Sequence, residues 1–224
     1  MTDIVFLVDD DPNVLRSLGL LLHSSGFRVL PSASAEAFEH VLAIEGLAED
    51  RIPNDGIGRC LVLDINMPGT NGRELFDRLK QRHLIDMLPV IPLTGHGDVA
   101  MAVEMVQAGA HYFLEKPPNT DQLVDLIRKA HRKSVAAMET TRVLRAEMAR
   151  WAKLSDRELE VVQLLMKGMS NQQVCDKLNI GMATIKTHRL SARRKLNVRE
   201  FVELTPSPKV LELITKRSAQ ASNA

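Results

Sequence analysis

The sequence has few cysteines and no long apolar run. Its two cysteines, Cys60 and Cys175, fall in a predicted strand and a predicted helix, which argues against a disulfide framework and favours two buried thiols. No apolar stretch approaches the roughly 18 residues that a membrane span needs. The amino-terminal segment also lacks the basic region and cleavage site of a secretion signal. These absences predict a cytoplasmic protein that does not contact a membrane.

Charge is unevenly distributed along the chain. Residues 1–122 hold 9 Lys and Arg against 18 Asp and Glu, a net charge of −9, whereas the remaining 102 residues hold 20 against 10, a net charge of +10. A length of 224 residues suffices for two modest domains. The asymmetry predicts two domains with different partners, the second a candidate for binding a polyanion. Chance segregation of solvated charge is the alternative that counting leaves open.

The acidic half alternates short apolar runs with helical stripes. Runs that suit strands lie at 4–8, 28–30, 60–63, 90–93 and 112–114, and helices are expected to begin near 12, 34, 71, 99 and 120. Five strands that alternate with five helices predict an α/β fold, a doubly wound parallel sheet of the flavodoxin-like kind with helices on both faces.

Polar residues follow four of these strands. Asp9 and Asp10 follow the first, Asp64 the third, Thr94 the fourth and Lys116 the fifth. The carboxyl ends of parallel strands share one edge of a sheet, so these side chains are expected to converge there. Three close carboxylates repel one another unless a divalent cation joins them, and an oxygen-only set suits Mg²⁺. Lys116 and Thr94 supply what a phosphoryl group needs, with Asp64 as the nucleophile. Singly, each residue also suits a turn, a cap or a solvated position; their joint placement favours a site.

This half resembles the receiver domain of bacterial two-component response regulators. The resemblance rests on Asp9-Asp10, on Leu-Asp-Ile-Asn-Met-Pro-Gly-Thr-Asn-Gly around Asp64, on Leu-Thr-Gly-His-Gly-Asp around Thr94 and on Glu-Lys-Pro-Pro around Lys116. It implies that a sensor histidine kinase phosphorylates Asp64. It also implies that Asp10, Asp64 and the backbone carbonyl of Asn66 ligate Mg²⁺, with Asp9 acting through water.

The same resemblance implies a switch. Thr94 would follow the phosphoryl group inward, and Phe113 would rotate into the space that Thr94 leaves, shifting a population between two states. Lys116-Pro117 is expected to be a cis peptide. The surface of the helix from Val99 and the strand at Tyr112 would form a dimer face on phosphorylation.

Two segments lie outside this pattern. Residues 45–59 are about ten residues longer than the family connection, which predicts a flexible surface loop away from the pocket. Residues 120–153 contain no Gly or Pro, so residues 123–153 are expected to continue the last receiver helix as a linker. The linker suits either a coiled-coil seam or a solvated helix whose apolar ends pack on their own domains.

The basic half, residues 154–217, predicts an all-α helix-turn-helix domain. Ser155 and Glu158 form a capping-box signature, Ser170 or Asn171 caps a second helix, and a third helix rich in Lys and Arg runs from Ala183 to about Leu196. The segment resembles the LuxR-type output domain in Leu-Ser-Asp-Arg-Glu-Leu-Glu-Val, Gly-Met-Ser-Asn-Gln-Gln-Val, Leu-Asn-Ile, Thr-Ile-Lys-Thr-His-Arg and Arg-Lys-Leu-Asn-Val.

The third helix carries the expected contacts with duplex DNA. By position in the motif, the base-facing residues are Lys186, Thr187 and Leu190, and those nearer the phosphates are Asn171, His188, Arg193 and Arg194, with Arg189 also on the outward side. A solvated basic helix is the alternative. His188 equally suits a core position, and Leu190 reads a thymine methyl or nothing. Gly181 stands where the family has a Ser cap, which loosens the helix start modestly.

The tail departs from the output family. Thr205-Pro-Ser-Pro interrupts the helix that dimerises in relatives, Val210 to Thr215 begins a further short helix, and residues 218–224 are expected to be a disordered tail.

These features predict a phosphorylation-activated transcription regulator of the FixJ/NarL type. It would dimerise when phosphorylated and bind promoter DNA, with RNA polymerase as a further candidate partner and no enzymatic turnover beyond slow dephosphorylation. One rival is a phosphatase or hydrolase with an aspartyl-phosphate intermediate, which sustained turnover of a small phosphate ester would support. The other is a constitutive DNA-binding protein with a vestigial pocket, which an Asp64→Asn variant that keeps full promoter activity would support.

Overall fold

The computed structural model describes residues 2–47, 52–95, 99–201 and 204–222, and only the backbone of the last five of these. The chain divides into two compact units, residues 1–140 and 141–224. Among the described residues, no helix combines the length and apolarity that crossing a bilayer requires.

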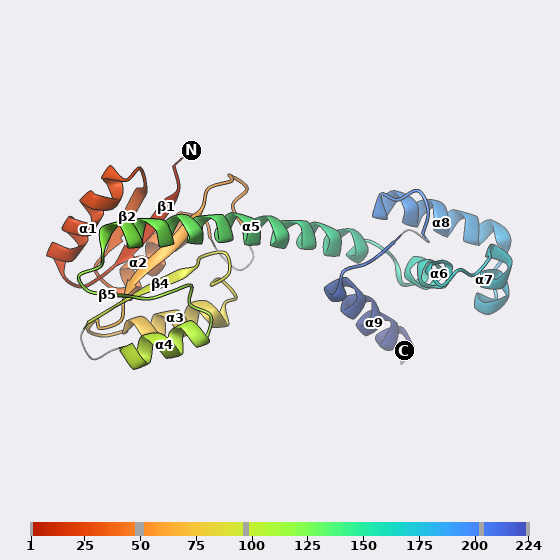
Figure 1. Ribbon diagram of the computed structural model, residues 1–224. Coiled ribbons are helices and arrows are strands. Elements are labelled where there is room, and N and C mark those ends of the chain that lie inside the picture. The colour runs from red at the N-terminus through yellow and green to blue at the C-terminus, as the bar shows by residue number, and fades with distance from the viewer. Residues whose placement is uncertain (1, 48–51, 96–98, 202–203, 223–224) are drawn as a thin grey trace. The chain divides into compact units, whose positions relative to one another are not determined.

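The first unit is built on a five-stranded parallel sheet, which confirms the predicted fold class (Figure 1). The strand order is β2-β1-β3-β4-β5. The strands are β1 (Ile4–Val8), β2 (Arg28–Ser32), β3 (Arg59–Asp64), β4 (Val90–Thr94) and β5 (Leu114–Glu115). The helices between and after them are α1 (Pro12–Ser24), α2 (Ala35–Ile44), α3 (Gly72–Gln81), α4 (Val99–Gln107) and α5 (Thr120–Ala152).

Helices cover both faces of this sheet, and successive side chains of a strand point to opposite faces. In β1, Phe6 and Val8 join a core with α2, α3 and α4, whereas Val5 and Leu7 join a second core with α1 and α5. Figure 1 shows α1 and α5 on one side of the sheet and α3 and α4 on the other. Such two-sided burial explains why the central strands read as continuous apolar runs rather than alternating patterns.

Helix α5 runs without interruption from Thr120 to Ala152, as the absence of Gly and Pro predicted. Its earlier part is buried in the first unit through Ile127, Ala130 and Met138, and Trp151 near its end is buried in the core of the second unit. Both ends of the helix thus pack on their own units, as the solvated-linker alternative requires, while the coiled-coil alternative stays untested.

The connection between α2 and β3 is anchored where the structure describes it. Residues 48–51 of the predicted loop lie outside the described residues, but Ile52 and Ile57 pack on the core. The guanidinium of Arg59, at the start of β3, pairs with Asp55 at 2.6 Å and is almost fully buried. A Cβ on Gly58 would lie 2.5 Å from Cβ of His131, so glycine is required for this close approach to α5. Residues 52–58 are therefore part of the packed unit rather than a free loop, and they enter β3 at the end opposite to Asp64.

The second unit contains α6 (Asp156–Met166), α7 (Asn171–Leu178), α8 (Met182–Leu196) and α9 (Pro208–Ser222). Ser155 and Ser170 each form a complete capping box at the start of α6 and α7. Helices α7 and α8 each end at an asparagine in the left-handed conformation, Asn179 and Asn197. Since Asn tolerates this conformation, it ends both helices without a glycine. Gly181 caps α8 with no side-chain hydrogen bond, in agreement with the sequence.

Helix α9 is longer than the sequence pattern suggested. It begins at Pro208, which suits the first helical position, and its backbone remains helical to Ser222, beyond the expected end of the folded domain at residue 217. Val210 and Ile214 are buried in the core of the unit. Arg217 donates to the carbonyl of Leu154 at 2.9 Å. These tertiary contacts extend a helix that local sequence alone leaves short.

An ion pair with a buried carboxylate joins α6 to α8. The carboxylate of Glu158 accepts hydrogen bonds from Nζ of Lys195 at 2.6 Å and from the backbone N–H of Ser155 at 2.7 Å. Burial raises the pKa of Glu158, but hydrogen bonds from Lys195, Ser191 and Ser155 outweigh it and lower the pKa from 4.5 to about 2. Stability from this carboxylate is therefore fully present above pH 4.5 and is lost as the pH falls toward 2.

Replacement of Glu158 by Gln is expected to reduce the free energy of unfolding of the second unit by about 2 kcal/mol at neutral pH, because it leaves Lys195 without its carboxylate. The wild-type and variant stabilities should converge in acid. Urea unfolding followed by the fluorescence of Trp151, the single tryptophan, measures the difference. The control is Glu160→Gln, whose half-exposed pair with Arg157 should contribute less than about 1 kcal/mol. Equal losses in the two variants would contradict a structural role for the buried pair.

Candidate functional site

Three carboxylates meet at the carboxyl ends of β1 and β3. Val8 of β1 pairs with Leu63 of β3, so Asp9 and Asp64 extend side by side beyond the sheet. Oxygens of Asp9, Asp10 and Asp64 all lie within 4.8 Å of one another. Asp9 and Asp64 are buried and Asp10 is exposed, so the cluster opens to solvent on one side.

Lys116 brings a compensating charge to this cluster. The backbone N–H of Lys116 donates to the carbonyl of Thr94 at 2.7 Å, which continues the pairing of β5 with β4 and sets the side chain at the same edge. Its Nζ lies 2.5 Å from Oδ2 of Asp9 and 2.9 Å from Oδ2 of Asp64. The Lys116-Pro117 peptide is cis, as expected.

Electrostatics make the cluster receptive to a dication. Burial raises the pKa of Asp64, and the Asp9 charge adds to this rise against the opposing effect of Lys116. Burial lowers the pKa of Lys116, but hydrogen bonds to Asp9 and Asp64 outweigh it and raise the pKa. Three carboxylates and one ammonium carry a net charge of −2 when all are ionised. The donor set, all oxygen and partly open to water, fits Mg²⁺.

Thr94 lies at the same sheet edge as the cluster, and Phe113 directly precedes β5 in the chain. Thr94 ends β4 and is fully buried, yet its hydroxyl has no hydrogen-bond partner among the described residues. Buried hydroxyls are normally paired, so this one is available to a group that enters the pocket. Phe113 is half-buried and stacks on the exposed Tyr112, with ring centroids 6.1 Å apart.

The loop that leaves Asp64 requires a glycine at residue 72. The backbone N–H of Gly72 donates to the carbonyl of Ile65 at 2.9 Å, and a Cβ there would lie 2.1 Å from the carbonyl oxygen of Asp64. The sequence alone gives no sign of this close approach. The backbone N–H of Asn66 donates to Oδ1 of Asp64 at 3.3 Å, but the role expected for the Asn66 carbonyl stays a prediction.

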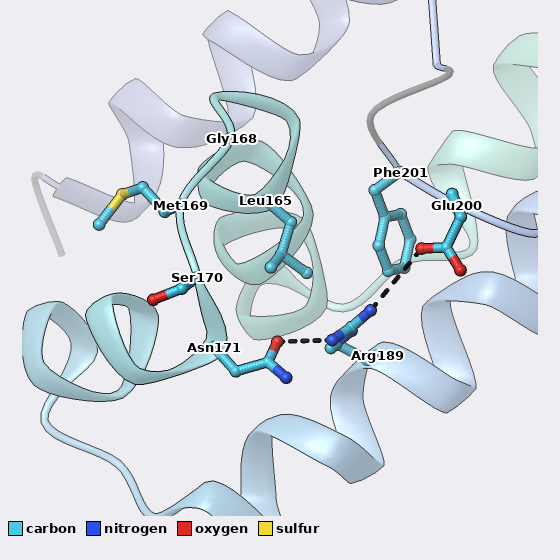
Figure 2. A pocket seen from close by; sticks show the side chains of 8 residues that line it. All are labelled: Leu165, Gly168, Met169, Ser170, Asn171, Arg189, Glu200 and Phe201. Atoms are coloured by element: carbon cyan, nitrogen blue, oxygen red, sulfur yellow. Dashed lines mark hydrogen bonds and ion pairs between the residues drawn. The ribbon is translucent and has the colours of Figure 1, made fainter.

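The predicted DNA-contact residues of α8 divide into two groups. Lys186, Thr187, Leu190 and Arg194 are exposed, and the Leu190 side chain is 62% accessible. His188, Arg189 and Arg193 are half-buried. Arg189 donates to Oδ1 of Asn171 at 2.6 Å, so two of the predicted DNA-contact residues touch each other within the unit (Figure 2). Glu200, which sequence reasoning missed, lies 3.9 Å from both Arg189 and Arg193. No local pattern marks Glu200, because the contact depends on how the chain turns after α8.

Two protein families match this chain. The response regulator receiver domain family matches residues 5–128, and the family of bacterial regulatory proteins called the luxR family matches residues 152–206. The chain is a response regulator with a LuxR-type output domain. It therefore belongs to a family of transcription regulators in which the receiver implies a sensor kinase partner and the output domain implies DNA binding.

Response regulators of known function resemble it along nearly its whole length. Transcriptional regulatory protein FixJ of Bradyrhizobium diazoefficiens is 36% identical over 89% of this chain and 91% of that protein. C4-dicarboxylate transport transcriptional regulatory protein DctR of Rhodobacter capsulatus is 35% identical over 91% and 98%.

Solved structures agree with this assignment. Response regulator StyR matches with a TM-score of 0.74 and 32% identity over 96% of this chain and 100% of that one. Full-length FixJ from B. japonicum matches with a TM-score of 0.52 and 33% identity, covering 98% and 99%.

Gly72→Ala is expected to destabilise the first unit of this response regulator by about 2 kcal/mol or more, because the new Cβ would collide with backbone at Asp64. Differential scanning calorimetry of the full chain measures the loss. Gly19→Ala is the matched control, since nothing lies within 4 Å of a Cβ there and the helix interior favours Ala. Equal melting temperatures for Gly72→Ala and wild type would show that the loop has room for a side chain.

Proposed function

We propose that this response regulator accepts a phosphoryl group on Asp64 from a histidine kinase, with Mg²⁺, and that phosphorylation shifts the receiver to a dimerising state that promotes binding to promoter DNA. The observation that carries the proposal is the convergence of three carboxylates, Lys116 and the unpaired Thr94 hydroxyl at one sheet edge. We expect slow loss of the phosphoryl group and no sustained turnover.

The residues present fit Mg²⁺, with Asp10, Asp64 and the carbonyl of Asn66 as direct ligands. Both carboxylate oxygens of Asp9 already accept hydrogen bonds, one from Lys116 and one from the backbone N–H of Asp11 at 3.0 Å. In this proposal Asp9 acts on the ion through water. Bound there, the ion would neutralise negative charge on the phosphoryl oxygens.

In the transfer itself, an Asp64 carboxylate oxygen forms a bond to phosphorus while the phosphorus–nitrogen bond of the kinase phosphohistidine breaks. Lys116 pairs with an oxygen of the transferred group. The unpaired hydroxyl of Thr94 donates to another, which draws Thr94 inward and lets Phe113 turn into the vacated space. The pocket and the aromatic ring together form a two-state element that one new charge biases.

Apolar side chains support the proposed dimer face. Val99 and Val103 of α4, four residues apart on one side of the helix, are 37% and 40% exposed, and Tyr112 is 46% exposed. Large apolar residues gathered on one surface mark interaction sites. We assign phosphorylation-dependent dimerisation to this face.

DNA binding is assigned to α8. Lys186, Thr187 and Leu190 would face bases, and the residues nearer phosphates would be Asn171, His188, Arg189, Arg193 and Arg194. In functional terms residues 1–122 act as the receiver, 123–153 as the connecting helix, 154–217 as the output domain and 218–224 as the tail. RNA polymerase is a further partner in this proposal.

Incubation of the full chain with acetyl phosphate and Mg²⁺ is expected to add the mass of one phosphoryl group, as seen by intact-protein mass spectrometry. Asp64→Asn should abolish the gain, because the amide cannot attack phosphorus. Asp86→Asn, a change of the same kind at an exposed residue, should leave it intact. A gain in mass that persists in Asp64→Asn, or that is unchanged when Mg²⁺ is removed, would refute the assignment of this pocket.

Arg194→Ala is expected to weaken binding to all duplex sequences alike and to lower the salt dependence by about 0.9 log unit per log salt, the effect of one lost phosphate contact. Lys186→Ala should instead relax the base preference at one position of the site, at a cost of about 1–3 kcal/mol. Fluorescence anisotropy and DNA selection measure the two effects. Lys216→Ala, at an exposed residue of α9, is the control; an equal loss in that variant would argue against α8 as the DNA-binding helix.

A further inference from the structure

A carboxylate reaches the proposed phosphate-contact residues of α8 from within the same unit. Glu200 lies four residues beyond the end of α8. Its Oε2 is 3.9 Å from Nη2 of Arg189, and its Oε1 is 3.9 Å from Nη2 of Arg193 (Figure 2 shows Glu200 beside Arg189). One anion thus faces two of the cations that the proposed function assigns to DNA phosphates.

Arg189 is held in place from its other side. Its Nη1 donates to Oδ1 of Asn171 at 2.6 Å, and its side chain is 26% exposed. The guanidinium therefore has a fixed orientation in which Nη2 points toward Glu200. Beside it lies a hollow of about 220 Å³ whose lining includes Asn171, Arg189, Glu200 and Phe201. A guanidinium fixed at the rim of an open hollow is preorganised for an anion.

The contact of Glu200 is weak enough to be exchanged. The Glu200 side chain is 57% exposed, and at 3.9 Å neither contact is a direct hydrogen bond. Exposed pairs of this kind contribute at most about 1 kcal/mol. Glu158, a second acidic partner of α8, contrasts with it, since it is buried and lies 2.6 Å from Lys195. The buried Glu158 therefore stabilises the fold, whereas the exposed Glu200 partly neutralises two arginines at the surface.

We infer that Glu200 is an internal substitute for a DNA phosphate, which neutralises Arg189 and Arg193 in the free protein and is displaced when a phosphate of duplex DNA binds them. The inference rests on the proposed function, in which α8 contacts DNA. Because a phosphate and a carboxylate cannot share the same two guanidinium groups without repulsion, binding must move Glu200 away. Glu200 therefore lowers affinity for any duplex, whatever its sequence.

Glu200→Gln in the full chain tests this competition, with binding to a labelled duplex of mixed sequence measured by fluorescence anisotropy in the presence of acetyl phosphate and Mg²⁺. We expect about threefold to tenfold tighter binding at low salt, because the two weak pairs no longer oppose the phosphate. The slope of affinity against salt should stay that of wild type, since the same phosphates are contacted. Glu212→Gln, which removes an equal charge from exposed α9, should change affinity less than about twofold.

A cycle with Arg193→Ala separates local competition from general charge. The gain from Glu200→Gln should shrink in the Arg193→Ala background, because one of the two contested cations is gone. An undiminished gain, a gain equal to that of Glu212→Gln, or weaker binding by Glu200→Gln would overturn the inference. The last result would make Glu200 a residue that positions the arginines. Wild-type protein that fails to bind duplex at low salt even with acetyl phosphate and Mg²⁺ present would instead refute the proposed function.

Glu200→Asp serves as the second variant if Glu200→Gln disturbs the neighbouring buried Phe201, which unfolding followed by Trp151 fluorescence would reveal. It keeps the charge and moves the carboxylate farther from both arginines. We expect binding between that of wild type and Glu200→Gln. Affinity unchanged from wild type in a folded Glu200→Asp protein would contradict competition at this distance.

Discussion

The ammonium of Lys116 between the carboxylates of Asp9 and Asp64 is the interaction on which the receiver pocket depends. It exists because parallel strands deliver their carboxyl ends to one edge, and because the backbone of Lys116 continues the pairing of β5 with β4. Without this cation the two buried carboxylates would face each other at a large electrostatic cost. With it, the pocket keeps enough negative charge to attract a dication while offering a positive group to a phosphate.

The second unit uses charge differently. Its fold depends on apolar packing, on two capping boxes and on the buried pair of Glu158 with Lys195, while the exposed cations of α8 remain on the surface. Arg189 and Arg193 of α8 are partly balanced by Glu200. A response regulator must bind DNA reversibly, and an internal carboxylate that competes weakly with phosphate is one physical means to keep unspecific affinity low.

Features with a local signature could be predicted from the sequence. The strand ends at Asp64 and Thr94, the cap at Ser155 and the uninterrupted helix to Ala152 all follow from residues close together in the chain, and the structure confirms them. The assignment of the family also followed from motifs of this kind.

Features that depend on contacts between distant segments could not be predicted. The collision that forbids a side chain at Gly72, the packing of Gly58 against His131 and the approach of Glu200 to Arg193 each join segments whose spacing no periodicity encodes. The length of α9 also escaped prediction, because Arg217 beyond the predicted stretch is held by the carbonyl of Leu154, which is far away in the sequence. For the functional residues, the sequence predicted which side chains form the pocket, while the structure showed which charged groups pair with one another.

The most direct measurement of the central claim is selection of duplex DNA from a random pool by the full chain, with and without acetyl phosphate and Mg²⁺, in wild type and Asp64→Asn. If phosphorylation of Asp64 controls DNA binding, wild type should enrich a defined site only when donor and metal are both present. Asp64→Asn should enrich none under either condition. Enrichment of the same site by Asp64→Asn, or by wild type without donor, would contradict the account.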